Sequence, residues 1–205
     1  MGSASFLRLP PRPAVPVKAL MHRFPRLNAA VWNVQYRLGM WNYIDSGSGA
    51  QIRALLEKYA DRPKILDLGC GRTINTGLTA DKYRHYHGVD ISMNAIQTAR
   101  RLARPNTSFE AADILRYETG QRYDAILLRE VLYYLPAEKV AEFLRRIAGF
   151  LEPVGKIFIQ FWDASACMQS IDIVRNSGLR VLEEQVTRAN GGPESIIIVL
   201  ALRTG

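Results

Sequence analysis

Short apolar runs alternate with helical patterns along most of the chain. Five runs read as buried strands, at residues 64–68, 86–90, 109–113, 123–128 and 156–161. Between them, apolar residues recur at helical spacing over 93–103, from Pro136 to Ile147, and over 164–176. Strands that alternate with helices predict an α/β protein with a parallel sheet and helices on both faces.

The end of the chain breaks this alternation. Two further strands are predicted at 179–186 and 196–202, and the turn Asn190-Gly191-Gly192-Pro193 lies between them. No helix fits between 187 and 194, so these strands must be antiparallel neighbours. The pattern therefore predicts a seven-stranded, mostly parallel sheet that ends in an antiparallel carboxyl-terminal hairpin.

The first 46 residues differ from the rest. Residues 1–17 contain four prolines and predict an extended arm, whereas 18–46 are apolar and aromatic and predict a helical lid. In this lid Leu27, Val31, Val34 and Leu38 share one helix face. We expect residues 47–205 to form the main domain.

Charge is concentrated in the same region. Residues 1–45 contain six Lys and Arg against Asp45 alone, which gives +5 of the total formal charge of +8. Such a basic arm could attract nucleic acid, anionic lipid or an acidic substrate, or could simply be a solvated surface. No apolar run approaches the roughly 20 residues of a membrane span, so we expect no transmembrane segment.

The first predicted strand ends in Asp67-Leu68-Gly69-Cys70-Gly71, a turn where a ligand can approach the main chain closely. A dinucleotide fingerprint would need a third glycine where Ile74 stands, and no phosphate-loop pattern is present. Asp90 ends the next strand and can accept hydrogen bonds from ribose hydroxyls. Asp90 would also suit the ribose of a nicotinamide cofactor. It therefore indicates a nucleoside ligand without selecting a particular one.

The order and spacing of these motifs, together with Ala111-Ala112-Asp113-Ile114, resemble class I S-adenosylmethionine-dependent methyltransferases, which have a Rossmann-like fold. The run Glu130 to Pro136 is similar to small-molecule methyltransferases of the ubiquinone-biosynthesis and nodulation types. In the resemblance, Asp113 takes the adenine amino group, while Ile114 and Ile91 pack on the ring. The cofactor site that the resemblance implies comprises Asp67, Gly69, Cys70, Gly71, Asp90, Ile91, Asp113, Ile114 and Arg129. Thr73, Arg129 and Val154 depart from the usual family pattern.

Strand order places Glu130, Tyr133 and Tyr134 beside the transferred methyl group, and we list them as catalytic candidates. The three histidines, by contrast, are interpreted as structural. In the lid, Tyr36, Arg37, Trp41 and Tyr43 either close over the cofactor and substrate or pack the lid onto the sheet.

The expected activity is methyl transfer from S-adenosylmethionine to oxygen or nitrogen of a small molecule, with secondary metabolites among the candidates. Alternatives are a nucleic-acid or protein methyltransferase that uses the basic arm, a non-catalytic cofactor-binding partner, and a nicotinamide oxidoreductase. We expect no metal, because the sequence shows no ligand cluster, and we do not expect nucleic acid as a partner. Two cysteines without a C-x-x-C pattern favour a reducing compartment, so the expected location is the cytoplasm.

Overall fold

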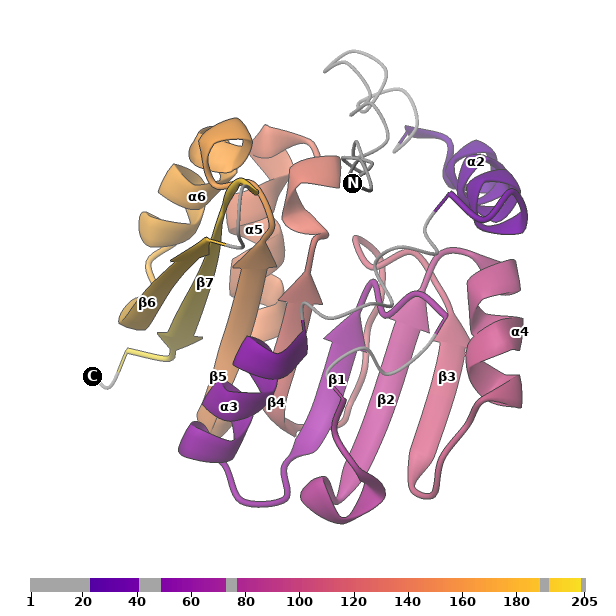
Figure 1. Cartoon of the computed structure of the whole chain (residues 1–205). Coiled ribbons are helices and arrows are strands. Elements are labelled where there is room, and N and C mark those ends of the chain that lie inside the picture. Colours follow the sequence, from indigo (N-terminus) through magenta and orange to yellow (C-terminus); the bar gives the residue numbers. More distant parts are fainter. Residues whose placement is uncertain (1–22, 41–48, 73–76, 189–191, 204–205) are drawn as a thin grey trace, which may run out of the picture.

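Seven strands form one sheet in the order β3-β2-β1-β4-β5-β7-β6 (Figure 1). The computed structural model describes residues 23–40, 49–72, 77–188 and 192–203. The strands are β1 Lys64–Leu68, β2 His85–Asp90, β3 Thr107–Ala111, β4 Tyr123–Arg129, β5 Leu151–Phe161, β6 Arg180–Arg188 and β7 Glu194–Ala201. β1 to β5 pair in parallel, and β7 pairs antiparallel with both β5 and β6. The predicted parallel sheet and antiparallel terminal hairpin are therefore confirmed.

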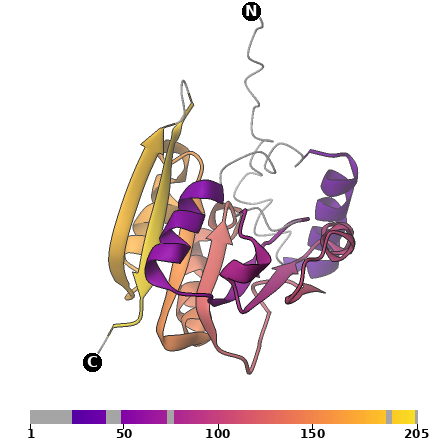
Figure 2. The ribbon, with the colours of Figure 1, turned by 60° about the horizontal axis from the view of Figure 1, so that its bottom comes forward.

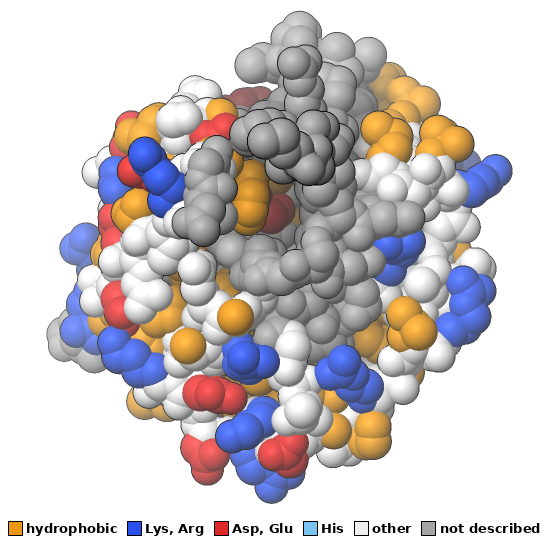
Figure 3. All heavy atoms as spheres, in the orientation of Figure 1, with side chains coloured by type: hydrophobic (Ala, Val, Ile, Leu, Met, Phe, Trp, Pro, Cys, Tyr) orange, Lys and Arg blue, Asp and Glu red, His pale blue; other side chains and the backbone are white. Residues whose placement is uncertain are grey.

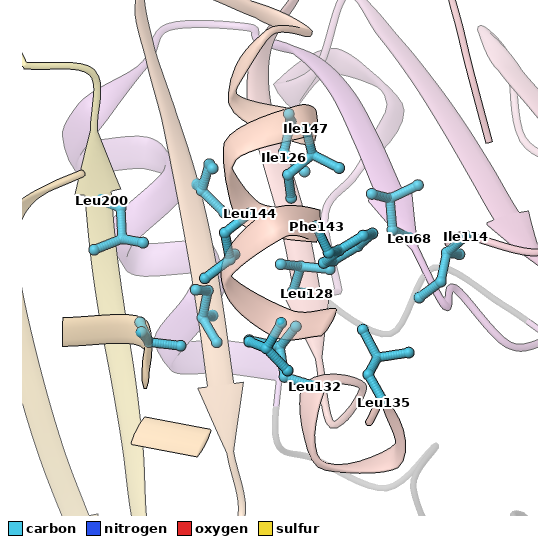
Figure 4. Close-up of a cluster of buried hydrophobic side chains, with 14 of the residues drawn as sticks. Leu68, Ile114, Ile126, Leu128, Leu132, Leu135, Phe143, Leu144, Ile147 and Leu200 are labelled. Carbon is cyan, nitrogen blue, oxygen red and sulfur yellow. The ribbon is translucent and has the colours of Figure 1, made fainter. Parts of the chain in front are cut away.

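Helices cover both faces of the sheet, as predicted (Figures 1 and 2). The α-helices in the described ranges are α2 Pro25–Arg37, α3 Gly49–Tyr59, α4 Met93–Arg101, α5 Ala137–Ala148 and α6 Met168–Arg175, of which α3 to α6 cover the sheet faces. Side chains of α3 and α4 pack on one face, with Ile65 and Leu127, and those of α5 and α6 pack on the other. Figure 4 shows Phe143 and Leu144 of α5 beside Leu128 of β4. Successive strand residues thus enter opposite cores, which explains why the strands read as continuous apolar runs.

Some element boundaries differ from the sequence prediction. β5 begins at Leu151 instead of 156, because Leu151 pairs with Tyr123 before the register shifts. Gly155 lies in this irregular stretch, where an added Cβ would come within 2.9 Å of the Tyr123 carbonyl oxygen. The helix expected over 164–176 begins as a 3-10 turn at Ser165–Cys167 and becomes α-helical only at Met168.

The amino-terminal helix α2 is held against α4 by one asparagine. Asn33 Oδ1 accepts hydrogen bonds from Ser92 Oγ at 2.8 Å and from the Asn94 amide at 3.1 Å. The Asn94 side chain donates in turn to the Asn33 carbonyl at 3.0 Å. These bonds fix α2 beyond the carboxyl ends of the parallel strands (Figure 1).

The apolar face predicted for α2 does not enter the core. Leu27 and Val34 are each 49% exposed and Leu38 is 70% exposed. The opposite face, which includes the buried Asn28, turns toward the sheet. No described helix has the length and apolar character that crossing a membrane requires.

Candidate active site

A cavity of about 980 Å³, counting its open mouth, lies at the carboxyl ends of β1, β2 and β4. Its walls contain every residue predicted to contact the cofactor. These residues are Asp67, Gly69, Cys70, Gly71, Asp90, Ile91, Asp113, Ile114 and Arg129. Parallel strands bring their carboxyl ends to one edge of the sheet, so motifs 46 residues apart in the chain meet here (113 − 67 = 46).

The loop after β1 depends on two glycines with positive φ. Gly69 has φ 82° and Gly71 has φ 65°, a region that side chains disfavour. A Cβ on Gly69 would lie 2.3 Å from Val131 Cγ2, and one on Gly71 would lie 3.1 Å from the Tyr36 hydroxyl. The loop is thus enclosed by the segment that follows β4 on one side and by α2 on the other.

Asp67, at the end of β1, is 3% exposed. Its Oδ2 accepts a 2.5 Å hydrogen bond from the Tyr86 hydroxyl. Burial raises the pKa of Asp67, while the Tyr86 bond and the Arg129 charge oppose that rise. Among the described residues, its buried Oδ1 has no hydrogen-bond partner. An acceptor left in this state is costly unless a ligand satisfies it.

Asp90, at the end of β2, holds the loops on either side of it. Oδ2 accepts from the Gly71 amide at 3.0 Å and Oδ1 accepts from the Ser92 amide at 2.8 Å. Burial raises the pKa of Asp90 to about 6, although both amide bonds favour the carboxylate. Each carboxylate oxygen keeps a second lone pair that can accept from a ligand hydroxyl.

Asp113 follows β3 and resembles Asp67 in its bonding. Oδ1 accepts from the Leu115 amide at 3.0 Å, and the buried Oδ2 has no partner in the described part of the chain. Ile114 and Ile91 line the cavity with it. The site therefore combines an acceptor and apolar side chains, a combination suited to a flat heterocycle that carries an amino group.

The catalytic candidates occupy different positions. Glu130 and Tyr134 line the cavity, whereas Tyr133 does not and is only 4% exposed. Glu130 has φ 57°, a strained conformation for this residue type. Its Oε2 accepts from the Tyr133 hydroxyl and from the Trp162 amide, both at 3.0 Å. Tyr133 and β5 thus fix the direction of the Glu130 carboxylate.

Arg129 and Glu130 are both tied to Gln160 of β5. The Arg129 Nε donates to Gln160 Oε1 at 3.2 Å, and the Glu130 amide donates to the Gln160 carbonyl at 3.0 Å. Arg129 is 8% exposed and contributes a positive charge near Asp67. The departure from the family pattern at Arg129 therefore adds a buried cation to the cavity wall.

Helix α2 forms a further wall of the cavity. Asn28, Trp32 and Tyr36 line it, and the Trp32 ring meets the Tyr134 ring edge-on at 5.0 Å between centroids. Burial raises the pKa of Tyr36, with a contribution from Asp90. Of the two predicted lid residues within the described ranges, Tyr36 lines the cavity.

Arg37, the next lid residue, is exposed and does not contact the cavity. Trp41 and Tyr43 lie outside the described residues. Conversely, the sequence analysis missed Asn28, Trp32, Arg72, Val131 and Leu135 as lining residues. The spacing of Asn28, Trp32 and Tyr36, each four residues apart, was the available signal for one shared helix face.

In the described ranges, no three His, Cys, Asp or Glu side chains are grouped as metal ligands would be.

Comparisons with known proteins show which families the chain is similar to. Residues 65–155 match the model of a methyltransferase domain family. Nodulation protein S of Bradyrhizobium diazoefficiens is 25% identical over 167 residues, covering 76% of this chain and 80% of that protein. The ubiquinone biosynthesis O-methyltransferase of Rickettsia felis is 26% identical, and the match covers 69% of this chain and 60% of that enzyme.

A solved structure with the same fold is 1,6-didemethyltoxoflavin-N1-methyltransferase of Burkholderia thailandensis. The TM-score is 0.74 at 17% identity, over 95% of this chain and 93% of that one. Residues 65–155 thus match a methyltransferase domain family, and the chain shares the fold of a solved methyltransferase.

Proposed function

We propose that this enzyme transfers a methyl group from S-adenosylmethionine to an oxygen or nitrogen of a small-molecule acceptor. The observation that carries the proposal is the meeting of three carboxylates, Asp67, Asp90 and Asp113, around one cavity. Two of them have a buried oxygen without a partner among the described residues. Relatives named for nodulation and ubiquinone biosynthesis support a small acceptor, and do not favour nucleic acid or protein as substrate.

The carboxylates fit the cofactor in the order of the strands. Asp67 would accept from the amino group of the methionine end, Asp90 from the ribose hydroxyls, and Asp113 from the adenine amino group. Ile91 and Ile114 would hold the adenine ring by apolar contact. Gly69 and Gly71 would let the main chain approach the ligand, because neither carries a side chain. A Cβ at these positions would also meet Val131 or Tyr36.

When bound, S-adenosylmethionine supplies an electrophilic methyl group on a sulfonium. The chain's own part is to orient the acceptor and to exclude water. Trp32, Tyr134 and Leu135 give the acceptor side of the cavity an aromatic and apolar surface suited to a flat molecule. Glu130 is the carboxylate best placed to accept a proton or a hydrogen bond from the attacking group. Tyr133 acts through Glu130 as a positioning residue.

The test begins with calorimetric titration of the purified protein with S-adenosylhomocysteine and, separately, with NADH. We expect binding of S-adenosylhomocysteine only. Methyl-labelled S-adenosylmethionine is then incubated with panels of phenols, catechols and heteroaromatic amines, and labelled product is counted. Binding without turnover of any acceptor would instead indicate a non-catalytic cofactor-binding partner. Tight NADH binding without S-adenosylhomocysteine binding would contradict the methyltransferase assignment itself.

A variant pair tests the acceptor side. Glu130→Gln should lower kcat by up to about 10²–10⁴-fold, which is the usual contribution of a general base. The affinity for S-adenosylhomocysteine should stay within about twofold. Tyr133→Phe should lower kcat less than Glu130→Gln, since it removes only one bond to the carboxylate. Equal activity of wild type and Glu130→Gln would exclude Glu130 from proton transfer.

We also propose a cytoplasmic location. Cys70 and Cys167 are both buried thiols, which supports a compartment that keeps thiols reduced.

A further inference from the structure

Helix α2 has two functional faces. One face carries Trp32 and Tyr36 and forms a wall of the cavity. On the opposite face, a stripe is formed by Phe24, Leu27, Val34 and Leu38, which are between 49% and 70% exposed. Figure 3 shows hydrophobic side chains at the surface over α2, at the upper right. We call these four residues the α2 stripe.

Basic residues accompany the α2 stripe. Arg23, Arg26 and Arg37 are all exposed on or next to this helix. At 100° per residue they lie together on one flank of the stripe. Residues 1–44 contain six Lys and Arg and no Asp or Glu. The region therefore combines exposed apolar side chains with an excess of basic over acidic residues in its own sequence.

We propose that the α2 stripe docks on the surface of an anionic lipid bilayer. A helix with an apolar face and flanking cations lies in the interface plane, where its apolar side chains enter the acyl boundary and its cations meet anionic headgroups. The geometry fits this mode, because the apolar side chains and the cations lie on or next to one helix and are all exposed.

Two other occupants fit less well. The phosphates of a nucleic acid would bind the arginines, but a nucleic acid would make no favourable contact with aliphatic side chains at the centre of the surface. A second copy of this chain, packed with its α2 antiparallel across the α2 stripe, would bring Arg23, Arg26 and Arg37 of both copies to the same side without acidic partners from α2.

Docking would place the cavity next to the bilayer, because its wall and the α2 stripe belong to the same helix. Acceptors with an apolar tail, which partition into lipid, would then reach the aromatic side of the cavity from the membrane. This inference goes beyond the proposed function and does not depend on it, since docking requires no methyl transfer.

The test measures co-sedimentation of the full chain with vesicles of phosphatidylcholine, with and without phosphatidylglycerol. We expect binding only when phosphatidylglycerol is present. The double variant Leu27→Ser/Leu38→Ser should bind at least about tenfold more weakly, because less apolar surface enters the bilayer. Val154→Ser/Val186→Ser is the matched control: these valines are 77% and 58% exposed on other elements, and their loss should leave binding unchanged.

A charge series completes the experiment. Arg26→Gln/Arg37→Gln should weaken binding about 25-fold, or about fivefold for each charge, whereas the exposed Arg145→Gln should have no effect. No binding to phosphatidylglycerol vesicles would overturn the proposal. Vesicle binding that is unchanged by the leucine substitutions would also overturn it. The same holds if the protein binds duplex DNA more tightly than vesicles, or if the wild type is a dimer that Leu27→Ser/Leu38→Ser converts to a monomer.

Discussion

The Tyr86 hydroxyl donates a 2.5 Å hydrogen bond to Asp67 Oδ2 across two neighbouring strands. Both groups are buried, so the bond satisfies an oxygen of a carboxylate that water does not reach. It also leaves Asp67 Oδ1 as the atom available to a ligand. Tyr86 is thus the residue that orients the first carboxylate of the site.

Replacing this tyrosine should affect both stability and ligand binding. Tyr86→Phe should lower the free energy of unfolding by about 1–3 kcal/mol, because it leaves a buried carboxylate oxygen without a donor. S-adenosylhomocysteine affinity should fall as well, since the pKa of Asp67 rises further without this bond. Denaturant unfolding and calorimetry measure the two effects.

Tyr83→Phe is the matched control. Tyr83 is equally buried, but its hydroxyl donates to the Pro105 carbonyl at 3.1 Å, away from the cavity. Its loss should destabilise the fold without changing ligand affinity. If both variants bound S-adenosylhomocysteine like the wild type, Tyr86 would have no role in orienting Asp67.

The ionisation of Asp90 predicts opposite pH trends for binding and folding. Its pKa is about 6 in the folded protein, against an ordinary value of 3.8. A ribose hydroxyl is best accepted by the carboxylate, so affinity for S-adenosylhomocysteine should fall about tenfold per pH unit below about pH 6. Calorimetry between about pH 7 and about pH 5 measures this fall.

The folded state holds the Asp90 proton in a range where the unfolded chain has lost it. The Asp90 contribution to the free energy of unfolding should therefore decrease as pH rises from 3.8 to about 6. Asp90→Asn should remove both trends and should bind more weakly at neutral pH. A pH profile of binding that is the same in wild type and Asp90→Asn would assign the titration to another group.

Gly69 should not tolerate a side chain. Gly69→Ala combines an unfavourable φ of 82° with a contact of 2.3 Å to Val131, so we expect a loss of about 2–4 kcal/mol in unfolding free energy. Adding Val131→Ala should recover the steric part but not the backbone part. Gly120→Ala, where a new Cβ meets nothing within 4 Å, should be nearly neutral. Thermal denaturation of the wild type and the three variants measures these effects. A melting temperature of Gly69→Ala equal to that of the wild type would contradict this reasoning.

Asp113 should select the base of the nucleoside. The wild type should bind S-adenosylhomocysteine about tenfold or more tightly than S-inosylhomocysteine, because a carboxylate accepts from an amino group but meets a carbonyl oxygen unfavourably. Asp113→Asn introduces a donor and should reduce or reverse that preference. An unchanged preference in the variant would show that Asp113 does not contact the base.

The sequence predicted which strand-end residues would line the cavity together, and the reason is physical. Asp67, Asp90 and Asp113 each end or directly follow a strand, so the strand order alone brings them to one edge of the sheet. The glycines at 69 and 71 mark the turn that the backbone requires there. Local motifs and a parallel topology together were enough to predict that these residues line one cavity.

The α2 wall could not be predicted in the same way. Hydrophobic periodicity selected the face of Leu27, Val34 and Leu38, which the structure turns to solvent. The face that closes the cavity carries Asn28, Trp32 and Tyr36, a mixed polar and aromatic set with little apolar periodicity. Periodicity detects a core-facing helix, whereas a helix that lines a binding cavity follows the chemistry of its ligand.

Gln160 contacts both charged residues that line the cavity at the end of β4. Its side chain holds Arg129 and its carbonyl holds Glu130, yet it does not line the cavity itself. A change of side chain at this position would remove one hydrogen bond from the cation while leaving the main-chain bond to Glu130 in place. The charge of the cavity wall therefore depends in part on a residue outside the wall, and a comparison restricted to cavity-lining positions would overlook it.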